Sequence, residues 1–415
     1  MRIFKFGGTS VKDAESIKNV VKVLEHEGIE NTLIVISAMG KMTNAFEKII
    51  ESYYFKEEAL QQHLTFVRNY HLNIIENLFG RKDQAVLIEV EKLLMELNDF
   101  LMFNKTSDYN FIYDQIVGFG ELLSTKIISI YLEEKGINNN WFDVRKYIKT
   151  DTNYRDAQVN WKHTKFNISK LNTKKLNITQ GFISSSSNGD STTLGREGSD
   201  YTAAIFAYCL DAKSVSIWKD VDGVLNADPR YFEDAQLLQQ ISYSEAIEMA
   251  FYGASVIHPK TLKPLENKNI PLYVRSFLNL DIQGTTVGKG HHLIPEIPCF
   301  ILKKRQILVS ISALDFSFMV EYNLRDIFEI LHEYKLKVNL IQNSALSFSV
   351  CIEDKFNNFQ AFISNLELKY KVSYFEDVSL YTIRHANDLA VHKIEQKGEL
   401  LLKQATKGTV QVIMQ

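Results

Sequence analysis

The chain opens with Met-Arg-Ile-Phe-Lys-Phe-Gly-Gly-Thr-Ser (residues 1–10), an apolar run that stops at two glycines and two hydroxyl residues. Apolar residues then recur at Ile17, Val20, Val21 and Leu24, which is the spacing of one helix face. The stretch therefore predicts a buried strand that turns sharply into an amphipathic helix. Backbone N–H groups exposed at such a turn, together with the positive end of the helix dipole, suit a phosphate group.

Lys5 stands near the end of this predicted strand, where its ammonium could meet a transferring phosphoryl group as a point charge. The amides of Gly7 and Gly8 could contribute further donors. A glycine pair after a strand is also a common tight turn, so the motif by itself leaves both interpretations open.

The composition is typical of a globular protein with two or three domains: 415 residues, of which 45% are hydrophobic and 23% charged. A net charge of -3 argues against a nucleic-acid surface as the main function. The three cysteines are far apart and predict neither a disulfide framework nor a metal site, which favours a reducing, cytoplasmic location. We expect no signal peptide before the first strand and no membrane span, because no apolar run is long enough.

Polar residues follow the next predicted strand, residues 32–37. Ser37 ends it and Thr43 comes shortly after. Ligands of open α/β sheets gather beyond the carboxyl ends of the strands, so both hydroxyls could donate to a substrate carboxylate or could simply serve as turn and cap residues. Residues 46–119 have a helical pattern whose aromatic residues we interpret as core packing. Glu121 then begins another helix, where it either complements the helix dipole or faces a ligand amine.

Two polar segments follow, and we interpret them differently. Residues 141–145 predict a strand that ends in an arginine, and residues 151–175 look like an exposed connection or a short meander without chemistry. The Ser- and Gly-rich residues 184–200 lie between a buried strand and an apolar helix, where a long irregular loop is typical of a functional site. Arg196 could clamp a carboxylate there, and Asp200 could cap the helix or face an ammonium group.

These stretches together resemble the aspartate kinases of the amino-acid kinase family. The matching segments stand in that family's order at residues 5–10, 180–183, 192–203, 218–230 and 252–259. The resemblance implies an α/β catalytic domain over residues 1–300, in which a mostly parallel sheet is sandwiched by helices. It implies no Walker A loop, and none is present in the sequence.

After residue 300 the predicted order of elements is βαββαβ, which resembles the ACT domains that regulate aspartate kinases. One full ACT unit covers about residues 305–376, and an abbreviated second unit runs to the C-terminus, with strands at 372–375 and 379–384 predicted as separate. Residues 301–415 are therefore expected to form an α+β regulatory region. ACT domains usually pair their sheets across subunits, so the resemblance also implies a homodimer.

The resemblance implies a role for each matching residue. Arg196 would bind the α-carboxylate of aspartate and Glu121 its α-amine. The implied catalytic residues are Lys5, Arg196 and Asp200, and the implied substrate-binding residues are Ser37, Thr43, Glu121, Arg196 and Asp200. The implied ATP-binding residues are Lys5, Gly7, Gly8, Lys219, Asp220, Leu225, Arg230, Ser255 and Val256. Leu225 stands where some members have Tyr and Ser255 where many have Lys, and no side chain is predicted to ligate a metal.

The implied reaction converts ATP and L-aspartate into ADP and 4-phospho-L-aspartate, the first step of lysine, threonine, methionine and diaminopimelate biosynthesis. The attacking β-carboxylate is already ionised at neutral pH, so the protein must position it and neutralise charge, with Mg²⁺ on the phosphates. His258 is then predicted to be a packed or capping residue rather than a base. Another amino-acid kinase and a non-catalytic amino-acid sensor remain alternatives.

Lysine or threonine is the expected effector of the ACT-like region. Two features leave this effector open. Glu321-Tyr322-Asn323 replaces the glycine-containing stretch that is usual in lysine-binding members, and Asn339 stands at a position that is often Asp.

Overall fold

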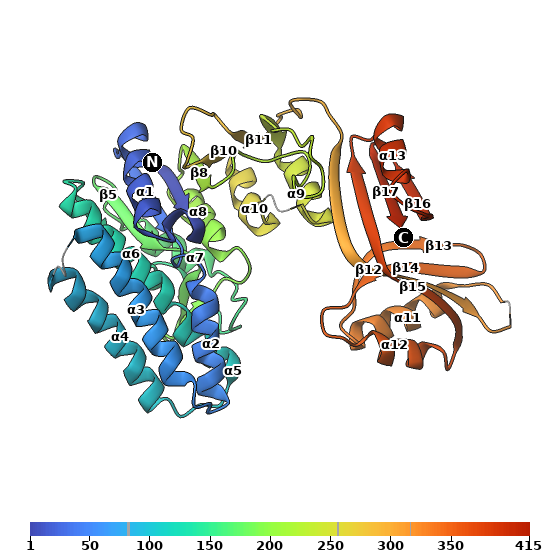
Figure 1. The fold of residues 1–415 in the computed structure, drawn as a ribbon, viewed down its shortest axis with the longest axis horizontal. Helices are drawn as coiled ribbons and strands as arrows, with labels where there is room; N and C mark the ends of the chain where they lie inside the picture. The colour runs from blue at the N-terminus through green and yellow to red at the C-terminus, as the bar shows by residue number, and fades with distance from the viewer. Residues whose placement is uncertain (81–83, 255–256, 316) are drawn as a thin grey trace. The chain divides into compact units, whose positions relative to one another are not determined.

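The computed structural model of the chain describes residues 1–80, 84–254, 257–315 and 317–415. The chain divides into two compact units, each with its own sheet (Figure 1). The first unit comprises Met1–Val224, Leu237–Ile247 and Val256–Ile294, and the second comprises Leu225–Gln236, Glu248–Ser255 and Pro295–Gln415. The second unit thus includes two short segments that the sequence places well before residue 295.

The first unit is built on an eight-stranded sheet. Its strands in spatial order are β3 (Asn139–Trp141), β5 (Leu176–Gln180), β2 (Thr32–Ile36), β1 (Arg2–Phe6), β8 (Ser214–Lys219), β10 (Leu272–Ser276), β11 (Thr285–Gly288) and β9 (Gln240–Ser242). All neighbours are parallel except β10 and β11. Every residue of β2 is buried, as expected for a parallel strand covered on both faces. The predicted α/β class with a mostly parallel sheet is confirmed.

The register at the centre of the sheet positions the site. Lys5 lies opposite Val35 of β2 on one side and Ile217 of β8 on the other. The carboxyl ends of these three strands are therefore level, and the residues that follow them leave the sheet at one edge. Strand β1 connects there to the short 3₁₀ helix η1 (Gly8–Val11) and then to α1 (Ala14–Glu27), as the sequence predicts.

Helices pack around this sheet, and the predicted helical region 46–119 is confirmed. The remaining helices are α2 (Met42–Tyr54), α3 (Leu60–Phe79), α4 (Gln84–Phe103), α5 (Tyr109–Val117), α6 (Phe119–Glu134), α7 (Trp161–Ile168), α8 (Gly198–Cys209), α9 (Tyr243–Tyr252) and α10 (Pro259–Lys268). Figure 1 shows α2 to α6 gathered as one group of helices. A three-stranded sheet of β4 (Lys149–Thr150), β6 (Ile183–Ser186) and β7 (Ser191–Thr193) lies beside α5.

The structure corrects two predictions about secondary structure in this unit. The strand expected over residues 141–145 ends at Trp141, and a 3₁₀ helix, η2 (Val144–Lys146), follows because the Asp143 side chain caps it at Arg145 N–H. The connection expected over residues 151–175 contains helix α7, whose first turn is capped by Asn160.

The second unit is a six-stranded antiparallel sheet with helices. Its elements are β12 (Cys299–Ala313), α11 (Glu321–Glu333), β13 (Lys337–Asn343), β14 (Ser347–Glu353), α12 (Phe359–Leu366), β15 (Tyr370–Arg384), α13 (Asp388–Glu395), β16 (Leu400–Thr406) and β17 (Thr409–Met414). The predicted βαββαβ order is confirmed. The spatial order β13-β14-β12-β15-β17-β16 joins both ACT-like halves in one sheet through the long strands β12 and β15.

Strand β15 replaces the two separate strands that the sequence predicts. No glycine or proline interrupts residues 370–384, and the chain absorbs the irregularity at Asp377, which has a φ of +55°, with a shift in register against β12. The core under α13 also explains why residues 225–236 belong to this unit. Ala227 and Phe232 are buried there together with Ile383 and Ile394.

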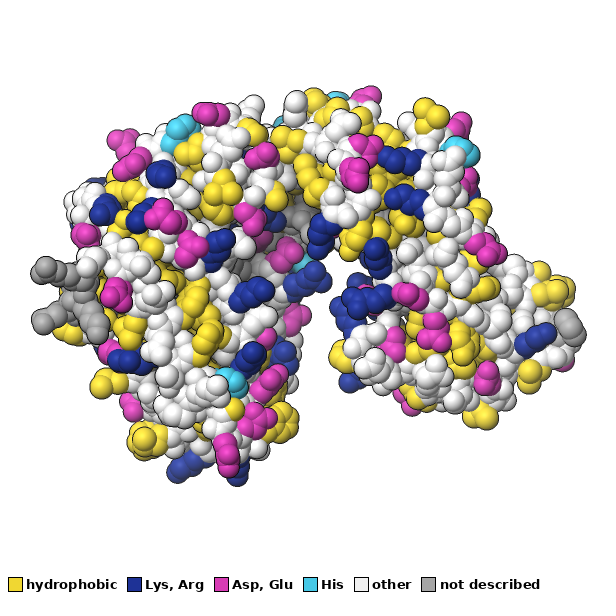
Figure 2. Space-filling model, in the orientation of Figure 1, with side chains coloured by type: hydrophobic (Ala, Val, Ile, Leu, Met, Phe, Trp, Pro, Cys, Tyr) yellow, Lys and Arg dark blue, Asp and Glu magenta, His cyan; other side chains and the backbone are white. Residues whose placement is uncertain are grey.

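The surface carries both signs of charge. Figure 2 shows acidic and basic side chains interspersed over the face that it displays, in keeping with the small net charge. None of the helices in the described part of the chain has the length and apolar character needed to cross a membrane.

Candidate active site

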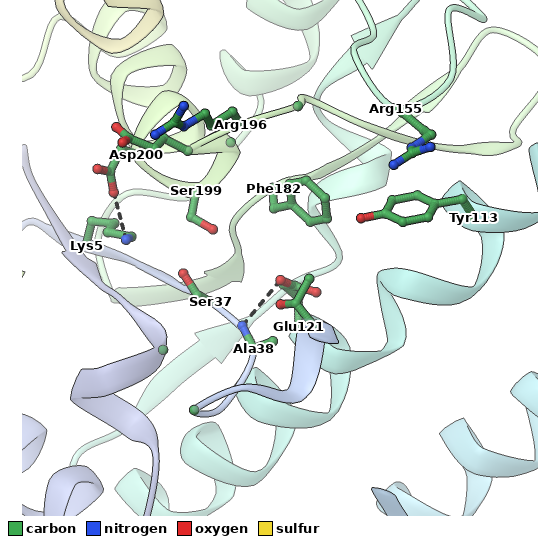
Figure 3. A pocket seen from close by; sticks show the side chains of 16 residues that line it. Lys5, Ser37, Ala38, Tyr113, Glu121, Arg155, Phe182, Arg196, Ser199 and Asp200 are labelled. Atoms are coloured by element: carbon green, nitrogen blue, oxygen red, sulfur yellow. Dashed lines mark hydrogen bonds and ion pairs between the residues drawn. The ribbon is translucent and has the colours of Figure 1, made fainter. Parts of the chain in front are cut away.

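A cavity of about 480 Å³ opens where β1 and β2 end, and we call it the strand-end pocket (Figure 3). It is lined by Lys5, Gly8, Ser37, Ala38, Gly40, Thr43, Tyr113, Glu121, Arg155, Phe182, Gly195, Arg196, Glu197, Gly198, Ser199 and Asp200. These residues come from six separate stretches of the chain, at residues 5–8, 37–43, 113–121, 155, 182 and 195–200. All three predicted catalytic residues and all five predicted substrate-binding residues are among them, so the fold brings them into one place.

Lys5 is held in this pocket by an ion pair. Its Nζ lies 2.7 Å from Oδ1 of Asp200, and both side chains are largely buried. Asp200 stands in the first turn of α8, where the helix dipole also favours a carboxylate. The pair fixes the ammonium at the edge of the sheet, where it could stabilise the negative charge of a phosphoryl group.

Gly8 is required by the close approach of two loops. A Cβ atom at this position would lie 2.7 Å from the carbonyl oxygen of Gly40 and 3.0 Å from that of Ala38. Gly40 N–H donates to the Gly8 carbonyl at 2.9 Å, which ties the loop after β2 to the loop after β1. Gly7 is not part of the pocket lining, but a Cβ there would come within 3.3 Å of Lys5 Nζ.

Glu121 is a buried carboxyl group with an unused oxygen. Its side chain is on α6, the residue is 2% exposed, and Oε1 accepts a hydrogen bond of 3.4 Å from Ala38 N–H. Oε2 has no hydrogen-bond partner among the described residues. Burial raises the pKa of Glu121 to about 8, and the Ala38 N–H offsets only part of that effect. Such a group is suited to receive a cationic ligand atom.

Sequence reasoning missed two residues of the pocket wall, Tyr113 and Arg155. Tyr113 is buried and donates to Glu47 at 2.9 Å, so its classification as core packing describes only part of its environment. Arg155 lies in the segment that was expected to carry no chemistry. No local pattern marks either residue, because each reaches the pocket through tertiary contacts rather than through a strand end.

Phe182 and Ser199 both line the pocket (Figure 3), and the glycine before Phe182 packs closely against Ser199. A Cβ at Gly181 would lie 2.4 Å from the Ser199 Cβ, so the two segments touch only because residue 181 is glycine. Phe182 itself has a φ of +69°, a conformation that side chains rarely adopt. Residues 180–183, Gln-Gly-Phe-Ile, are thus the sequence signal for this contact.

Of the predicted nucleotide-binding residues, only some line the strand-end pocket. Lys5 and Gly8 line the pocket, whereas Lys219 and Asp220 stand at and just beyond the end of β8, next to β1, but do not line it. Leu225 and Arg230 belong to the second unit, where the exposed Arg230 pairs with Asp228 at 2.6 Å. Ser255 and Val256 lie outside the described residues. The nucleotide-binding role of these six residues stays a prediction.

His258 is the N-cap of α10, in agreement with the capping role predicted for it. Its ring Nδ1 accepts a hydrogen bond from Lys260 N–H at 3.2 Å, and the backbone N–H of His258 donates to Oε2 of Glu197 at 2.8 Å. The pKa of His258 is lowered, mainly by burial. No trio of His, Cys, Asp or Glu side chains is arranged to hold a metal ion in the portion of the chain that the structure describes.

Comparison with known proteins identifies the class to which this fold and pocket belong. Residues 1–276 match the family model described as "Amino acid kinase family", and this range contains every residue of the strand-end pocket.

The chain is also 32% identical over 355 residues to lysine-sensitive aspartokinase 3 of Escherichia coli K12, which covers 85% of this chain and 78% of that protein. It is 34% identical over 299 residues to a bifunctional aspartokinase/homoserine dehydrogenase of Buchnera aphidicola, but spans only 36% of that longer protein.

Two solved structures of E. coli aspartokinase III have the same fold along the whole chain. The structure in complex with lysine and aspartate gives a TM-score of 0.82 at 28% identity, covering 100% of this chain and 96% of that one. The structure with aspartate and ADP gives 0.80 at 28% identity with the same coverage. The chain belongs to the amino acid kinase family and, within it, to the aspartokinases.

Proposed function

We propose that this chain transfers the γ-phosphoryl group of ATP to the β-carboxylate of L-aspartate, giving 4-phospho-L-aspartate and ADP. The observation that carries the proposal is the strand-end pocket, which combines a held ammonium at Lys5 with a buried carboxyl at Glu121 whose Oε2 has no hydrogen-bond partner among the described residues. An amino acid with a second carboxylate complements these two groups. The E. coli relative has been crystallised with aspartate and ADP, which supports the same ligands here.

The mechanism relies on positioning and charge neutralisation. The β-carboxylate needs no base, because it is ionised at neutral pH. Lys5 would stabilise the charge that spreads over the transferring phosphoryl oxygens, and Asp200 keeps its ammonium aimed at them. Glu121 would hold the α-ammonium and Arg196 the α-carboxylate, so that the β-carboxylate faces the nucleotide.

We propose that Mg²⁺ enters with the nucleotide. The described residues offer no three-ligand cage, which fits an ion that takes most of its ligands from phosphate oxygens and water. Asp200, the pocket carboxylate beside Lys5, is the residue we expect to orient its water shell. When bound, the ion neutralises phosphate charge.

We further propose that residues 301–415 form a regulatory region that binds an amino-acid effector and holds two subunits together as a homodimer, with residues 1–300 as the catalytic domain. The six-stranded sheet has open edges at β13 and β16, and exposed apolar side chains such as Ile341 and Phe375 lie on it. Lysine is the first effector to test, because the E. coli relative is described as lysine-sensitive. The three cysteines are all free, in keeping with a cytoplasmic location.

ADP release with and without aspartate tests the proposed function. We expect aspartate-dependent turnover by the wild type and a loss of roughly 100-fold or more in kcat for Lys5→Ala. Lys18→Ala is the matched control, since Lys18 is partly exposed and pairs with Glu15 on the same helix. Turnover with glutamate instead of aspartate would show another amino-acid kinase, and aspartate binding without turnover would show a sensor.

A further inference from the structure

The strand-end pocket contains a second arginine that the implied roles do not use. Arg155 comes from the loop between β4 and α7, and its side chain points toward the pocket beside Tyr113 (Figure 3). Figure 3 also shows that these two residues lie on the far side of Phe182 from Arg196 and Lys5. The pocket thus has a positive group on each side of Phe182.

The guanidinium of Arg155 is oriented by aromatic rings rather than by a carboxylate. Its Cζ lies 4.4 Å from the ring centroid of Tyr113 and 5.7 Å from that of Tyr109. Within the described residues, no acidic oxygen pairs with it at 4.0 Å or less. An arginine that stacks on a ring keeps the N–H donors along its edge free, and this edge is the one that matches a carboxylate.

The backbone of Arg155 is held in an unfavourable conformation by buried contacts. Its φ is +71°, and its N–H donates to Oδ2 of Asp114 at 3.0 Å. Asp114 is fully buried and also accepts the N–H and the hydroxyl of Thr193, at 2.9 and 2.8 Å. The next residue, Asp156, forms an ion pair with Lys260. Several contacts thus maintain the unfavourable backbone conformation of Arg155, which indicates that its side chain has to be held in this position.

The remaining charges of the pocket leave one ligand group for Arg155. Asp200 is engaged by Lys5, and Glu197 accepts a hydrogen bond from His258 N–H. Of the two carboxylates of aspartate, the β-carboxylate must face the phosphate near Lys5, so the α-carboxylate is the anion directed away from it.

We propose that Arg155 is a specificity-determining residue, which binds the α-carboxylate of the substrate through its free edge and shares this group with Arg196. This inference rests on the proposed function and deepens it, because it assigns a new residue to the same site. It predicts that the pocket selects amino acids by a carboxylate that is held between two arginines on different loops.

The test compares aspartate with L-isoasparagine, in which the α-carboxylate is an uncharged amide and the β-carboxylate is unchanged. We expect Arg155→Gln to lower kcat/KM for aspartate by about tenfold or more and to lower kcat/KM for isoasparagine far less. The preference for aspartate over isoasparagine should therefore fall by about tenfold, while KM for ATP stays within about twofold. Arg68→Gln is the control, because Arg68 is an exposed arginine on α3 that pairs with Glu91.

A pair of tyrosine variants separates a substrate contact from a structural role. Tyr113→Phe keeps the ring under Arg155 and loses only the hydrogen bond to Glu47, so it should keep the wild-type preference. Tyr113→Leu removes the ring and should reduce the preference in the same direction as Arg155→Gln. If Arg155→Gln changes turnover of both substrates equally, the residue is structural and the inference is overturned. Absence of aspartate turnover in the wild type would instead overturn the proposed function and, with it, this inference.

Discussion

The raised pKa of Glu121 predicts that aspartate binds more tightly as the pH increases toward 8. Burial raises this pKa to about 8, so at pH 7 only about a tenth of the empty sites carry an ionised carboxylate. The α-ammonium of aspartate needs the ionised form, because a protonated carboxyl offers little charge to it. Binding near neutral pH should therefore release close to one proton.

The size of this effect follows from the titration of one group. If only ionised Glu121 binds, the apparent affinity changes by roughly 25-fold between pH 6.5 and pH 8.5 for a pKa of about 8. Glu121→Gln removes the titration, so its affinity should be nearly independent of pH in this range. At pH 8.5 it should bind aspartate roughly 30-fold or more weakly than the wild type, since a charge-assisted hydrogen bond contributes about 2 kcal/mol.

The same pKa sets the sign of the effect on stability. In the folded protein the raised pKa keeps a proton that the unfolded chain releases, so the contribution of Glu121 to stability falls as the pH rises from about 4.5 to about 8. The melting temperature of Glu121→Gln should accordingly fall less than that of the wild type between pH 5.5 and pH 8.5. Thermal unfolding followed at both pH values measures this difference.

Isothermal titration calorimetry of aspartate in two buffers with different ionisation enthalpies measures the proton release directly. Glu91→Gln is the control, because Glu91 is an exposed carboxylate paired with Arg68. A wild-type affinity that stays constant from pH 6.5 to 8.5, with no proton release, would refute the reasoning. It would mean that Glu121 is already ionised in the empty pocket.

Three further predictions concern the pocket and its regulation. Gly8→Ala should lose roughly 1–3 kcal/mol of unfolding free energy in urea titrations, and most of its kcat, because the new Cβ would lie 2.7 Å from the Gly40 carbonyl oxygen; a stability equal to the wild type would contradict the close approach. Asp114→Asn should lose about 1–3 kcal/mol of unfolding free energy in urea titrations, because one amide oxygen cannot accept from both Thr193 donors and from the Arg155 N–H. An unchanged KM for aspartate would argue that Asp114 does not order the loop that carries Arg155. Lysine, titrated into the turnover assay to millimolar levels, should inhibit, and loss of inhibition by lysine, threonine and every other aspartate-derived amino acid would remove the proposed effector role.

Much of the architecture could be predicted from sequence, because local patterns determine it. The apolar run before Gly7 and the helical spacing after it encode β1 and α1, and the level ends of β1, β2 and β8 follow from parallel pairing. The sequence could not show that β15 is one continuous strand, because nothing in residues 376–378 signals whether a strand ends or bulges there. A bulge depends on the partner strand, which a single segment does not reveal.

The site residues that sequence reasoning found share one property. Lys5, Ser37 and Glu121 stand at the end of a strand or the start of a helix, positions that a sequence marks by glycines and polar residues. Tyr113 lies within a helix and Arg155 within an irregular loop. The position of Arg155 depends on Asp114, 41 residues earlier in the chain, so no window of local sequence contains the contact that places it.

The pairing of the charged groups indicates which of them are available to bind a ligand. Lys5 is paired with Asp200, and this ion pair orients its ammonium. Glu121 has no such partner, and a fully buried carboxyl with an unused oxygen costs folding free energy that an apolar residue would not. Arg155 is exposed, so the absence of an acidic partner for its guanidinium among the described residues costs little, and its strained backbone and ring contacts reveal the constraint. A cost in folding free energy therefore distinguishes Glu121 and a strained geometry distinguishes Arg155, which is why pH tests the role of the first and a substrate analogue tests the role of the second.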